Sequence, residues 1–201
     1  MKVHHIPNTR SVRIIWLLEE LGLQYDVEKY ELNPKSLRTE EYTKIHPMNR
    51  VPSLEDGDVT MFESGAIVQY LLARYGEGRL QPAVDSRWFP RYLQWLHYCE
   101  GMLMPQVNII VIQTILLPEE RRNPEALAQA RKQLTRMMSA VETELDGQDH
   151  LAGEFSAADI MTGHACMVAE RLGADVSDKP NVSAYNKRLS ERPALVRARA
   201  V

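Results

Sequence analysis

The sequence predicts a two-part fold: an α/β part over residues 1–76, a linker over residues 77–84, and an all-helical part over residues 85–201. Three observations support this division. Short β-like runs alternate with helical periodicity through about the first 75 residues. Beyond Asp85 the apolar residues recur only at helical spacing. Between the two parts, the stretch GEGRLQPAV carries two glycines and a proline, which is typical of a connecting loop.

The first part opens with a strand, a helix and a second strand. KVHHI is the first strand, ended by Pro7 and Asn8. RSVRIIWLLEELG has apolar residues at helical spacing, and Gly22 is its expected stop. YDVEKYEL alternates as a second strand does. Because a helix links the two strands, we expect them to be parallel neighbours.

The first part closes with a hairpin and a helix. A short helix is expected near Glu40 to Ile45. In VPSLEDGDVTMF, the pair Asp56-Gly57 lies between two apolar runs, which predicts a β-hairpin. The segment SGAIVQYLLARYG then has the periodicity of a helix, with Gly76 as its candidate cap.

The helical part begins with two long helices. The segment from Asp85 to about residue 117 predicts one long helix, and Pro105 within it predicts a kink, because proline removes a backbone hydrogen bond. Asn123-Pro124 is a favourable cap and first-turn pair. It opens a second helix whose apolar face continues until Gly147.

A third helix has a strongly specified start. In FSAADIMTGHACMVAERLG, Ser156 and Asp159 stand at the spacing of a capping box. Phe155 and Ile160 stand at the positions of a hydrophobic staple. We therefore assign Asp159 to helix capping rather than to chemistry. Further helices are expected over residues 181–190 and after Pro193.

Composition excludes several classes of protein. With 24 Lys+Arg against 27 Asp+Glu and no basic stripe, no nucleic-acid partner is expected. Only two cysteines occur and no Cys/His cluster has metal-ligand spacing, so we expect no metal and a reducing, cytoplasmic setting. The first residues lack the apolar segment of a signal peptide. The most apolar stretch, residues 107–117, is too short to span a bilayer, so no membrane segment is expected.

Two short motifs at predicted junctions point to a ligand. If the Val51-Pro52 bond is cis, the N–H and C=O of Val51 turn outward and can pair with the backbone of an extended peptide. Ser64 stands where the next helix starts, a place that favours a carboxylate, and Glu63 beside it can pair with an ammonium group. The alternative is that Pro52 merely opens a strand, Ser64 caps a helix and Glu63 is a solvated acid. Together the motifs favour a small peptide with a free amino-acid head, which fits glutathione.

The chain resembles the glutathione S-transferase family. The resemblance is carried by NTRSVRIIWLLEELGLQYD at residues 8–26, HPMNRVPSL at 46–54, FESGAIVQYL at 62–71 and GEFSAADI at 153–160. It covers nearly the whole chain, and it implies a thioredoxin-like N-terminal domain that binds glutathione. The all-helical C-terminal domain would contribute the electrophile site.

In this family a Tyr, Ser or Cys near the end of the first strand stabilises the glutathione thiolate. The chain has no Tyr before Tyr25 and no Cys before Cys99, so the resemblance leaves Asn8, Thr9, Ser11 and the positive charge of Arg10 at this junction. We rank Thr9 first, Ser11 second and Asn8 third. Helix capping is the alternative for each of them, and for Ser11 alone we favour it.

Other polar residues are assigned with less direct signals. Arg50 precedes Val51 and is expected to meet the glycyl carboxylate of glutathione, with a solvated surface side chain as the alternative. On the long helix, an apolar stripe is more often core or subunit contact than a substrate wall. If that helix lies across the cleft, as in the family, its candidates for the electrophile side are Arg91, Tyr92 and Met102. His4 and His5 are expected to be structural.

The resemblance implies a glutathione transferase of bacterial type, cytoplasmic and homodimeric. Its thiolate would attack small hydrophobic electrophiles or peroxides, with glutathione as co-substrate and without a metal. One alternative is a non-catalytic relative that keeps the fold for binding or regulation. Another is a glutathione-dependent isomerase or reductase on the same fold. PNTRS lacks the consecutive serines of the isomerase branch, and a disulfide oxidoreductase would need a cysteine in the first part.

Overall fold

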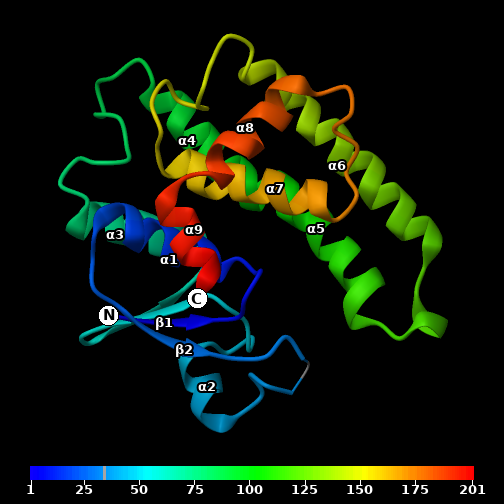
Figure 1. Ribbon diagram of the computed structural model, residues 1–201. Helices are drawn as coiled ribbons and strands as arrows, with labels where there is room; N and C mark the ends of the chain where they lie inside the picture. The colour runs from blue at the N-terminus through cyan, green and yellow to red at the C-terminus, as the bar shows by residue number, and fades with distance from the viewer. Residues whose placement is uncertain (34) are drawn as a thin grey trace. The chain divides into compact units, whose positions relative to one another are not determined.

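The computed structural model describes residues 1–33 and 35–201 (Figure 1). The chain divides into two compact units. The first comprises Met1–Arg79 together with Glu191–Val201, and the second comprises Leu80–Ser190. The sequence had suggested a single helical part over residues 85–201, whereas the structure groups the last eleven residues, 191–201, with the first unit.

The first unit is built on a four-stranded sheet with the order β2-β1-β3-β4. The strands are β1 (Lys2–His5), β2 (Asp26–Lys29), β3 (Ser53–Asp56) and β4 (Val59–Phe62). Strand β1 pairs with β2 in parallel, which confirms the predicted crossover, and β3 is antiparallel to both β1 and β4.

The predicted hairpin joins β3 and β4. Asp56 pairs with Val59, so the two loop residues are Gly57 and Asp58. Gly57 has a φ of 59°, the left-handed conformation that a tight hairpin turn requires and that glycine adopts without steric cost.

Three helices of the first unit follow the predicted order: α1 (Ser11–Leu21), α2 (Glu40–Ile45) and α3 (Ser64–Tyr75). Helix α1 ends as predicted at Gly22, which has a φ of 69°. The N–H of Leu23 donates to the carbonyl of Leu18 at 3.0 Å, which closes the helix end. Gly76 follows α3 but has a φ of −72°, so that helix ends without a left-handed cap.

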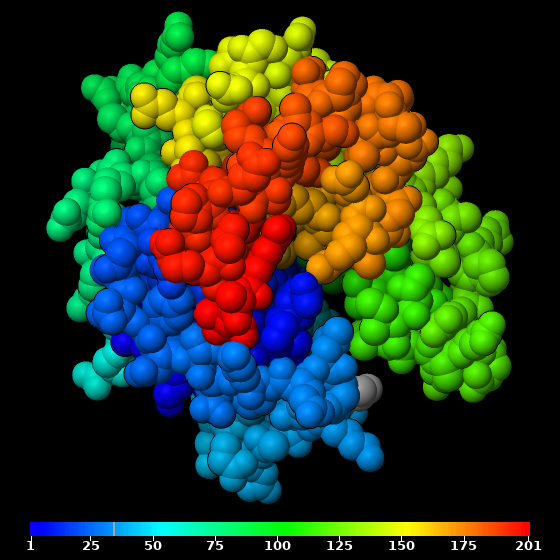
Figure 2. Space-filling model, viewed as in Figure 1, coloured from blue at the N-terminus to red at the C-terminus, as the bar shows by residue number. Residues whose placement is uncertain are grey.

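Helix α1 and the C-terminal helix α9 (Pro193–Ala200) pack together within the first unit (Figure 2). Arg192 donates from Nε and Nη2 to the two carboxylate oxygens of Glu20, at 2.7 and 2.9 Å. Arg197 donates to Glu19 at 2.5 Å. Leu195 on α9 is completely buried. These contacts explain why residues 191–201 belong to the first unit. Local sequence patterns do not predict them, because the paired residues are far apart in the sequence.

The long helix of the second unit begins later than the sequence suggested. Helix α4 spans Phe89–Tyr98, whereas residues 85–88 form turns. The hydroxyl of Ser86 accepts from the N–H of Trp88 at 3.2 Å, and its carbonyl accepts from the N–H of Phe89 at 3.0 Å. The expected start at Asp85 is therefore wrong, because Ser86 folds the preceding turn onto itself.

The long helix contains two π-helical turns. The first, Cys99–Leu103, lies between α4 and α5 (Met104–Val111), directly before Pro105, where we expected a kink. A widened turn is one way in which a helix accommodates a residue that lacks an N–H. The second, Ile112–Leu116, ends the helix. By length and composition residues 89–116 could cross a membrane, but core helices of soluble proteins pass the same test.

The remaining elements of the second unit are a short 3₁₀ turn and three helical segments: Glu119–Arg121, α6 (Pro124–Glu144), a π-helical turn Asp159–Gly163 that continues into α7 (His164–Arg171), and α8 (Pro180–Ser190). Asn123 caps α6 as predicted, accepting from the N–H groups of Glu125 and Ala126 at 3.0 Å each. The buried face of α6 includes Leu134, Met138 and Val141.

The predicted capping box starts the third long segment. Asp159 accepts from the N–H of Ser156 at 2.8 Å, and residue 157 is the first helical residue. Asp159 also accepts from the N–H of Leu151 at 3.0 Å and from the hydroxyl of Tyr185 at 2.8 Å. The carboxylate therefore joins the helix start, the preceding loop and α8 inside the second unit.

Candidate functional site

The first junction between strand and helix, residues 6–11 between β1 and α1, contains the three predicted thiol activators. Asn8 is exposed and has a φ of 63°, in the left-handed region. Thr9 is half-buried. Ser11, the first residue of α1, is fully buried. The sequence pattern places all three at one junction, but only the structure separates them by depth.

A hydrogen-bond network fixes Thr9 and Ser11. The hydroxyl of Thr9 donates to the carbonyl of Ile6 at 2.7 Å and lies 2.9 Å from the hydroxyl of Ser11. The Ser11 hydroxyl accepts from the N–H of Ile6 at 3.2 Å and lies 2.9 Å from Nδ1 of His5. Ser11 is thus enclosed by protein groups, whereas Thr9 lies at the outer end of the network.

His5 reaches this network from the middle of the sheet. It is 1% exposed, and burial, followed by the positive charge of Lys29, lowers its pKa from 6.5 to about 4. The imidazole is therefore neutral at pH 7. His4 is buried as well; its ring nitrogens contact the hydroxyl of Tyr30 at 2.9 Å and the carboxylate of Glu55 at 2.8 Å.

The second junction, residues 46–52 before β3, carries the Val51-Pro52 bond, and that bond is cis. Val51 packs against a small apolar cluster that contains Ile6, Leu37 and Tyr42. Ile6 therefore contacts both junctions: its side chain belongs to the cluster against which Val51 packs, and its carbonyl accepts from the hydroxyl of Thr9.

Hydrogen bonds inside the loop hold its path toward Val51. The hydroxyl of Tyr42 donates to the carbonyl of Arg50 at 2.5 Å. His46 accepts at Nδ1 from the N–H of Met48 at 3.2 Å, and its carbonyl accepts from the N–H of Asn49 at 2.8 Å. The side chain of Arg50 is exposed. These hydrogen bonds therefore hold the loop in one conformation, with the guanidinium of Arg50 exposed to solvent.

The third junction, between β4 and α3, is formed by Glu63 and Ser64. Glu63 is exposed and has a φ of 73°, an uncommon conformation for a residue with a Cβ. Such outliers persist where surrounding structure enforces them, and they cluster at functional sites. Ser64 is 2% exposed and begins α3.

Arg13 is a site residue that the sequence pattern did not reveal. It lies on α1, is completely buried, and donates from Nη1 to the hydroxyl of Ser64 at 3.3 Å. This contact links α1 to the start of α3. A charged residue inside the apolar run SVRIIWLL was the available signal, since buried arginine requires polar partners.

His46 is a second residue that the pattern missed. It is 4% exposed, and its ring stacks on Phe62 with centroids 4.4 Å apart. Burial lowers the pKa of His46, the negative charge of Glu63 opposes that shift, and Arg50 adds to it. Glu63 and Arg50, which are predicted to bind opposite ends of the ligand, therefore both influence the pKa of His46.

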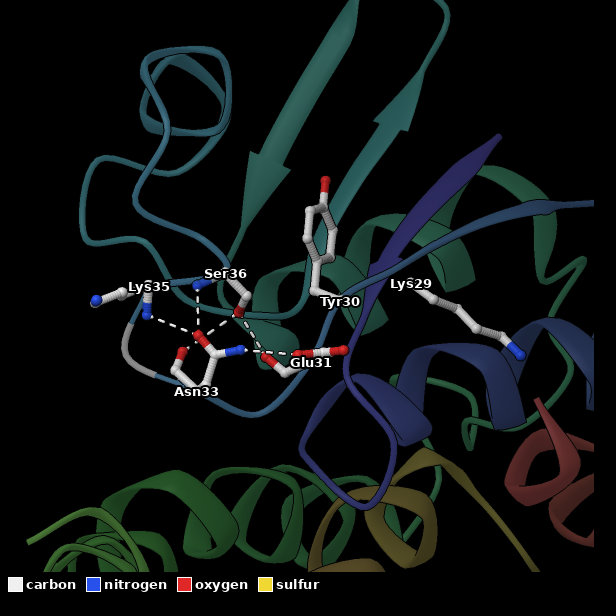
Figure 3. Close-up of a pocket in the computed structure, with 6 residues that line it drawn as sticks. All are labelled: Lys29, Tyr30, Glu31, Asn33, Lys35 and Ser36. Atoms are coloured by element: carbon white, nitrogen blue, oxygen red, sulfur yellow. Dashed lines mark hydrogen bonds between the residues drawn. The ribbon is translucent and has the colours of Figure 1, made fainter.

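A surface hollow of about 760 Å³ lies beside the end of β2 (Figure 3). Its lining residues are Lys29, Tyr30, Glu31, Asn33, Lys35 and Ser36. The side-chain oxygen of Asn33 accepts from the N–H groups of Lys35 and Ser36, at 2.9 and 2.8 Å. None of the predicted glutathione residues lines the hollow, so it is separate from the three junctions.

In the second unit, the predicted electrophile residues differ in exposure. Arg91 is half exposed and pairs with Glu144 at 3.1 Å. Tyr92 is 2% exposed, and burial raises its pKa to about 12. Met102 is 43% exposed. Tyr92 is therefore a core residue of α4, whereas Arg91 and Met102 face solvent within this unit. Among residues 1–33 and 35–201, no group of three His, Cys, Asp or Glu side chains is placed to hold a metal.

Comparisons with known proteins agree with this architecture. The family model for the glutathione S-transferase N-terminal domain matches residues 1–73, and the model for the C-terminal domain matches residues 103–193. Glutathione S-transferase 4 of Zea mays is 31% identical over 194 residues, 90% of this chain and 83% of the relative. Glutathione S-transferase 3 of Schizosaccharomyces pombe is 29% identical over 203 residues, 96% of this chain and 84% of the relative.

A solved structure is similar along its whole length. The sphingomonad glutathione S-transferase complexed with glutathione is 27% identical, with a TM-score of 0.82, covering 100% of this chain and 98% of that one.

Proposed function

The chain belongs to the glutathione S-transferase family, and from this we propose that it is a glutathione-dependent transferase that stabilises the thiolate of bound glutathione. The first unit is the thioredoxin-like part of that architecture, and the second is the helical part. The observation that carries the proposal is the junction of β1 and α1, where the half-buried hydroxyl of Thr9 ends a buried hydrogen-bond network.

The three junctions offer complementary contacts for glutathione. The backbone of Val51 would pair with the cysteinyl backbone, because among the described residues it has no hydrogen-bond partner. Ser64 and the start of α3 suit the carboxylate of the γ-glutamyl head, and Glu63 suits its ammonium group. Arg50, exposed at the end of the loop, suits the glycyl carboxylate.

Arg13 adds positive charge behind the γ-glutamyl subsite. Its guanidinium holds the hydroxyl of Ser64 and lies under the start of α3. The positive end of the helix dipole and the buried cation would then act on the same carboxylate. We therefore add Arg13 to the predicted set as the residue that orients Ser64.

Thiol activation is assigned to Thr9. A free thiol has a pKa of about 8.5, so most of it is protonated at pH 7, and a hydrogen bond to the sulfur favours the thiolate. Ser11 is enclosed and cannot reach a ligand without a rearrangement of its partners. Asn8 is exposed and supplies a second donor of the amide type.

The chemical step would be nucleophilic attack by the glutathione sulfur on a small hydrophobic electrophile. A bond forms between sulfur and the electrophilic carbon, the leaving group departs with its electron pair, and the thiol proton has already passed to solvent. Peroxides are the alternative acceptor. No step calls for a metal. We further propose a cytoplasmic homodimer, with Arg91 and Met102 as the solvent-facing candidates for the electrophile side.

The test is an ultraviolet titration of the thiolate of bound glutathione in wild type, Thr9→Ala and Ser11→Ala. Thr9→Ala should raise the thiol pKa by about one unit or more, since one hydrogen bond to the charged form is lost. Thr60→Ala removes an exposed hydroxyl on β4 and is the matched control. An unchanged thiol pKa in Thr9→Ala would remove Thr9 from the mechanism. A protein that binds glutathione resin but shows no thiolate at pH 7 would support the non-catalytic alternative.

A further inference from the structure

We propose that His5 is a positioning residue for thiol activation: its Nδ1–H donates to Ser11 and thereby makes the Thr9 hydroxyl the outermost donor of a one-directional hydrogen-bond chain. This inference rests on the proposed role of Thr9 and goes beyond it, because His5 lies behind the residues that face the ligand. It assigns a function to a buried imidazole for which the sequence predicts only a structural role.

The inference starts from three short contacts in series. Nδ1 of His5 lies 2.9 Å from Oγ of Ser11. Oγ of Ser11 lies 2.9 Å from Oγ1 of Thr9. Oγ1 of Thr9 lies 2.7 Å from the carbonyl oxygen of Ile6. All three distances are within the normal range for hydrogen bonds.

Counting protons fixes the direction of every bond in the series. A carbonyl oxygen can only accept, so Thr9 must donate its single proton to Ile6. The contact between Thr9 and Ser11 then requires the proton of Ser11. With that proton used, the contact between Ser11 and His5 requires a proton on Nδ1. No other assignment makes all three contacts hydrogen bonds.

The surroundings of Ser11 agree with this direction. Its oxygen has two lone pairs, and the N–H of Ile6 already donates to one of them at 3.2 Å. The Nδ1–H of His5 fills the other. Ser11 therefore keeps only its proton. Two acceptors lie within reach of that proton, the hydroxyl of Thr9 at 2.9 Å and the carbonyl of Ile6 at 3.2 Å, and the series uses the nearer one. The hydroxyl is fully buried, so water cannot replace any of these partners.

The protonation state of His5 selects one tautomer. Its lowered pKa of about 4 keeps the ring neutral at pH 7, so one nitrogen carries a proton and the other does not. The hydrogen-bond series assigns that proton to Nδ1. A neutral donor avoids a buried positive charge, which would be costly in this part of the sheet.

The consequence for catalysis is that the hydroxyl of Thr9 is oriented to donate a hydrogen bond to the glutathione sulfur. Thr9 can turn its proton from the carbonyl of Ile6 to the sulfur of glutathione while Ser11 still donates to it. Each accepted hydrogen bond polarises the next hydroxyl and strengthens it as a donor. His5 thus acts on the sulfur through Ser11 and Thr9, without touching glutathione.

The direct test is the tautomer of His5 in the wild-type protein with glutathione bound. Ring nitrogen shifts in the ¹⁵N-labelled protein distinguish a protonated Nδ1 from a protonated Nε2, and the His5→Asn variant identifies the His5 signal among six histidines. The expected result at pH 7 is a neutral ring with the proton on Nδ1. A neutral ring with the proton on Nε2 would overturn the proposal.

A second test uses variants and the thiol pKa of bound glutathione. His5→Leu removes the donor and should raise that pKa by about half a unit to one unit. His5→Asn keeps an N–H at a similar distance from the backbone and should restore most of the wild-type value. In a Thr9→Ala background, His5→Leu should add no further shift, because its route to the sulfur is already cut.

The outcomes separate this inference from the function on which it rests. If Thr9→Ala leaves the thiol pKa unchanged, the proposed role of Thr9 fails. If Thr9→Ala raises the pKa and both His5 variants leave it unchanged, only the role of His5 fails. Glutathione affinity, measured by calorimetry, should be nearly the same in His5→Asn and wild type. If His5→Leu does not fold, the tautomer and His5→Asn still decide the question.

Discussion

Replacing Asp159 by alanine should destabilise the second unit more than any other single loss of a polar group described above. The carboxylate is completely buried and accepts from four donors: the N–H of Leu151 at 3.0 Å, the N–H and the hydroxyl of Ser156 at 2.8 and 3.2 Å, and the hydroxyl of Tyr185 at 2.8 Å. The substitution removes all four acceptor contacts and leaves the donors inside the protein.

The magnitude follows from those donors. Each buried donor left without an acceptor costs about 1–3 kcal/mol, so the three closest, from Leu151 N–H, Ser156 N–H and the Tyr185 hydroxyl, cost about 3–9 kcal/mol. Burial raises the pKa of Asp159, and the hydrogen bonds from Leu151, Tyr185 and Ser156 oppose that shift. Removing the buried carboxylate relieves its desolvation cost and returns part of the loss. We expect a net loss of about 3–5 kcal/mol, a large share of the stability of a typical domain.

Urea unfolding, with midpoint and slope fitted separately, measures this loss. Tyr185→Phe removes one donor and should cost about 1–2 kcal/mol in wild type. In the Asp159→Ala background it should cost less, because its partner is already gone. Asp146→Ala, at an exposed site of the same unit, is the control and should stay within about 0.5 kcal/mol of wild type. An Asp159→Ala variant within about 1 kcal/mol of wild type would refute the reasoning.

Three further predictions concern stability. The pKa of His5 is about 4 in the fold against 6.5 as a reference, so the unfolded chain binds the proton more readily. About 3 kcal/mol of stability should therefore be lost as the pH falls from 6.5 to 4, and His5→Asn should flatten this slope in urea titrations. Gly163→Ala places a Cβ 2.3 Å from Cδ1 of Leu189 and should cost about 1–3 kcal/mol by thermal unfolding, with a less-than-additive loss when Leu189→Ala is added. Arg192→Ala removes the paired contacts to Glu20 and should cost about 1–2 kcal/mol, with faster proteolysis of the C-terminal helix.

The parts of the fold that sequence predicted are those with local causes. Gly57 and Gly22 mark turns that need a left-handed residue. Asn123 caps the helix that follows it, and Asp159 in a first helical turn accepts from the N–H of Ser156 before it. The start of the long helix was misplaced, since Ser86 offers a competing turn that apolar periodicity does not register. Local signals set element type well and set boundaries poorly wherever two local structures compete.

The candidate site was only partly predictable for the same physical reason. Residue types at the junctions indicated Thr9, Ser11 and Asn8, but their depth depends on how β1 is covered. His5 is buried because β1 lies between β2 and β3 in the sheet. The contact between Arg13 and Ser64 joins positions 51 residues apart. Such contacts are set by packing, which leaves little trace in the spacing of residues along the chain.

Residues 191–201 complete a unit whose other part ends at Arg79. During synthesis, the first unit stays incomplete until the whole second unit has been translated, because α9 follows it in the sequence. Until then the surface of α1 that α9 covers stays open to water. Fragments that stop before residue 191 should consequently be recovered as insoluble material.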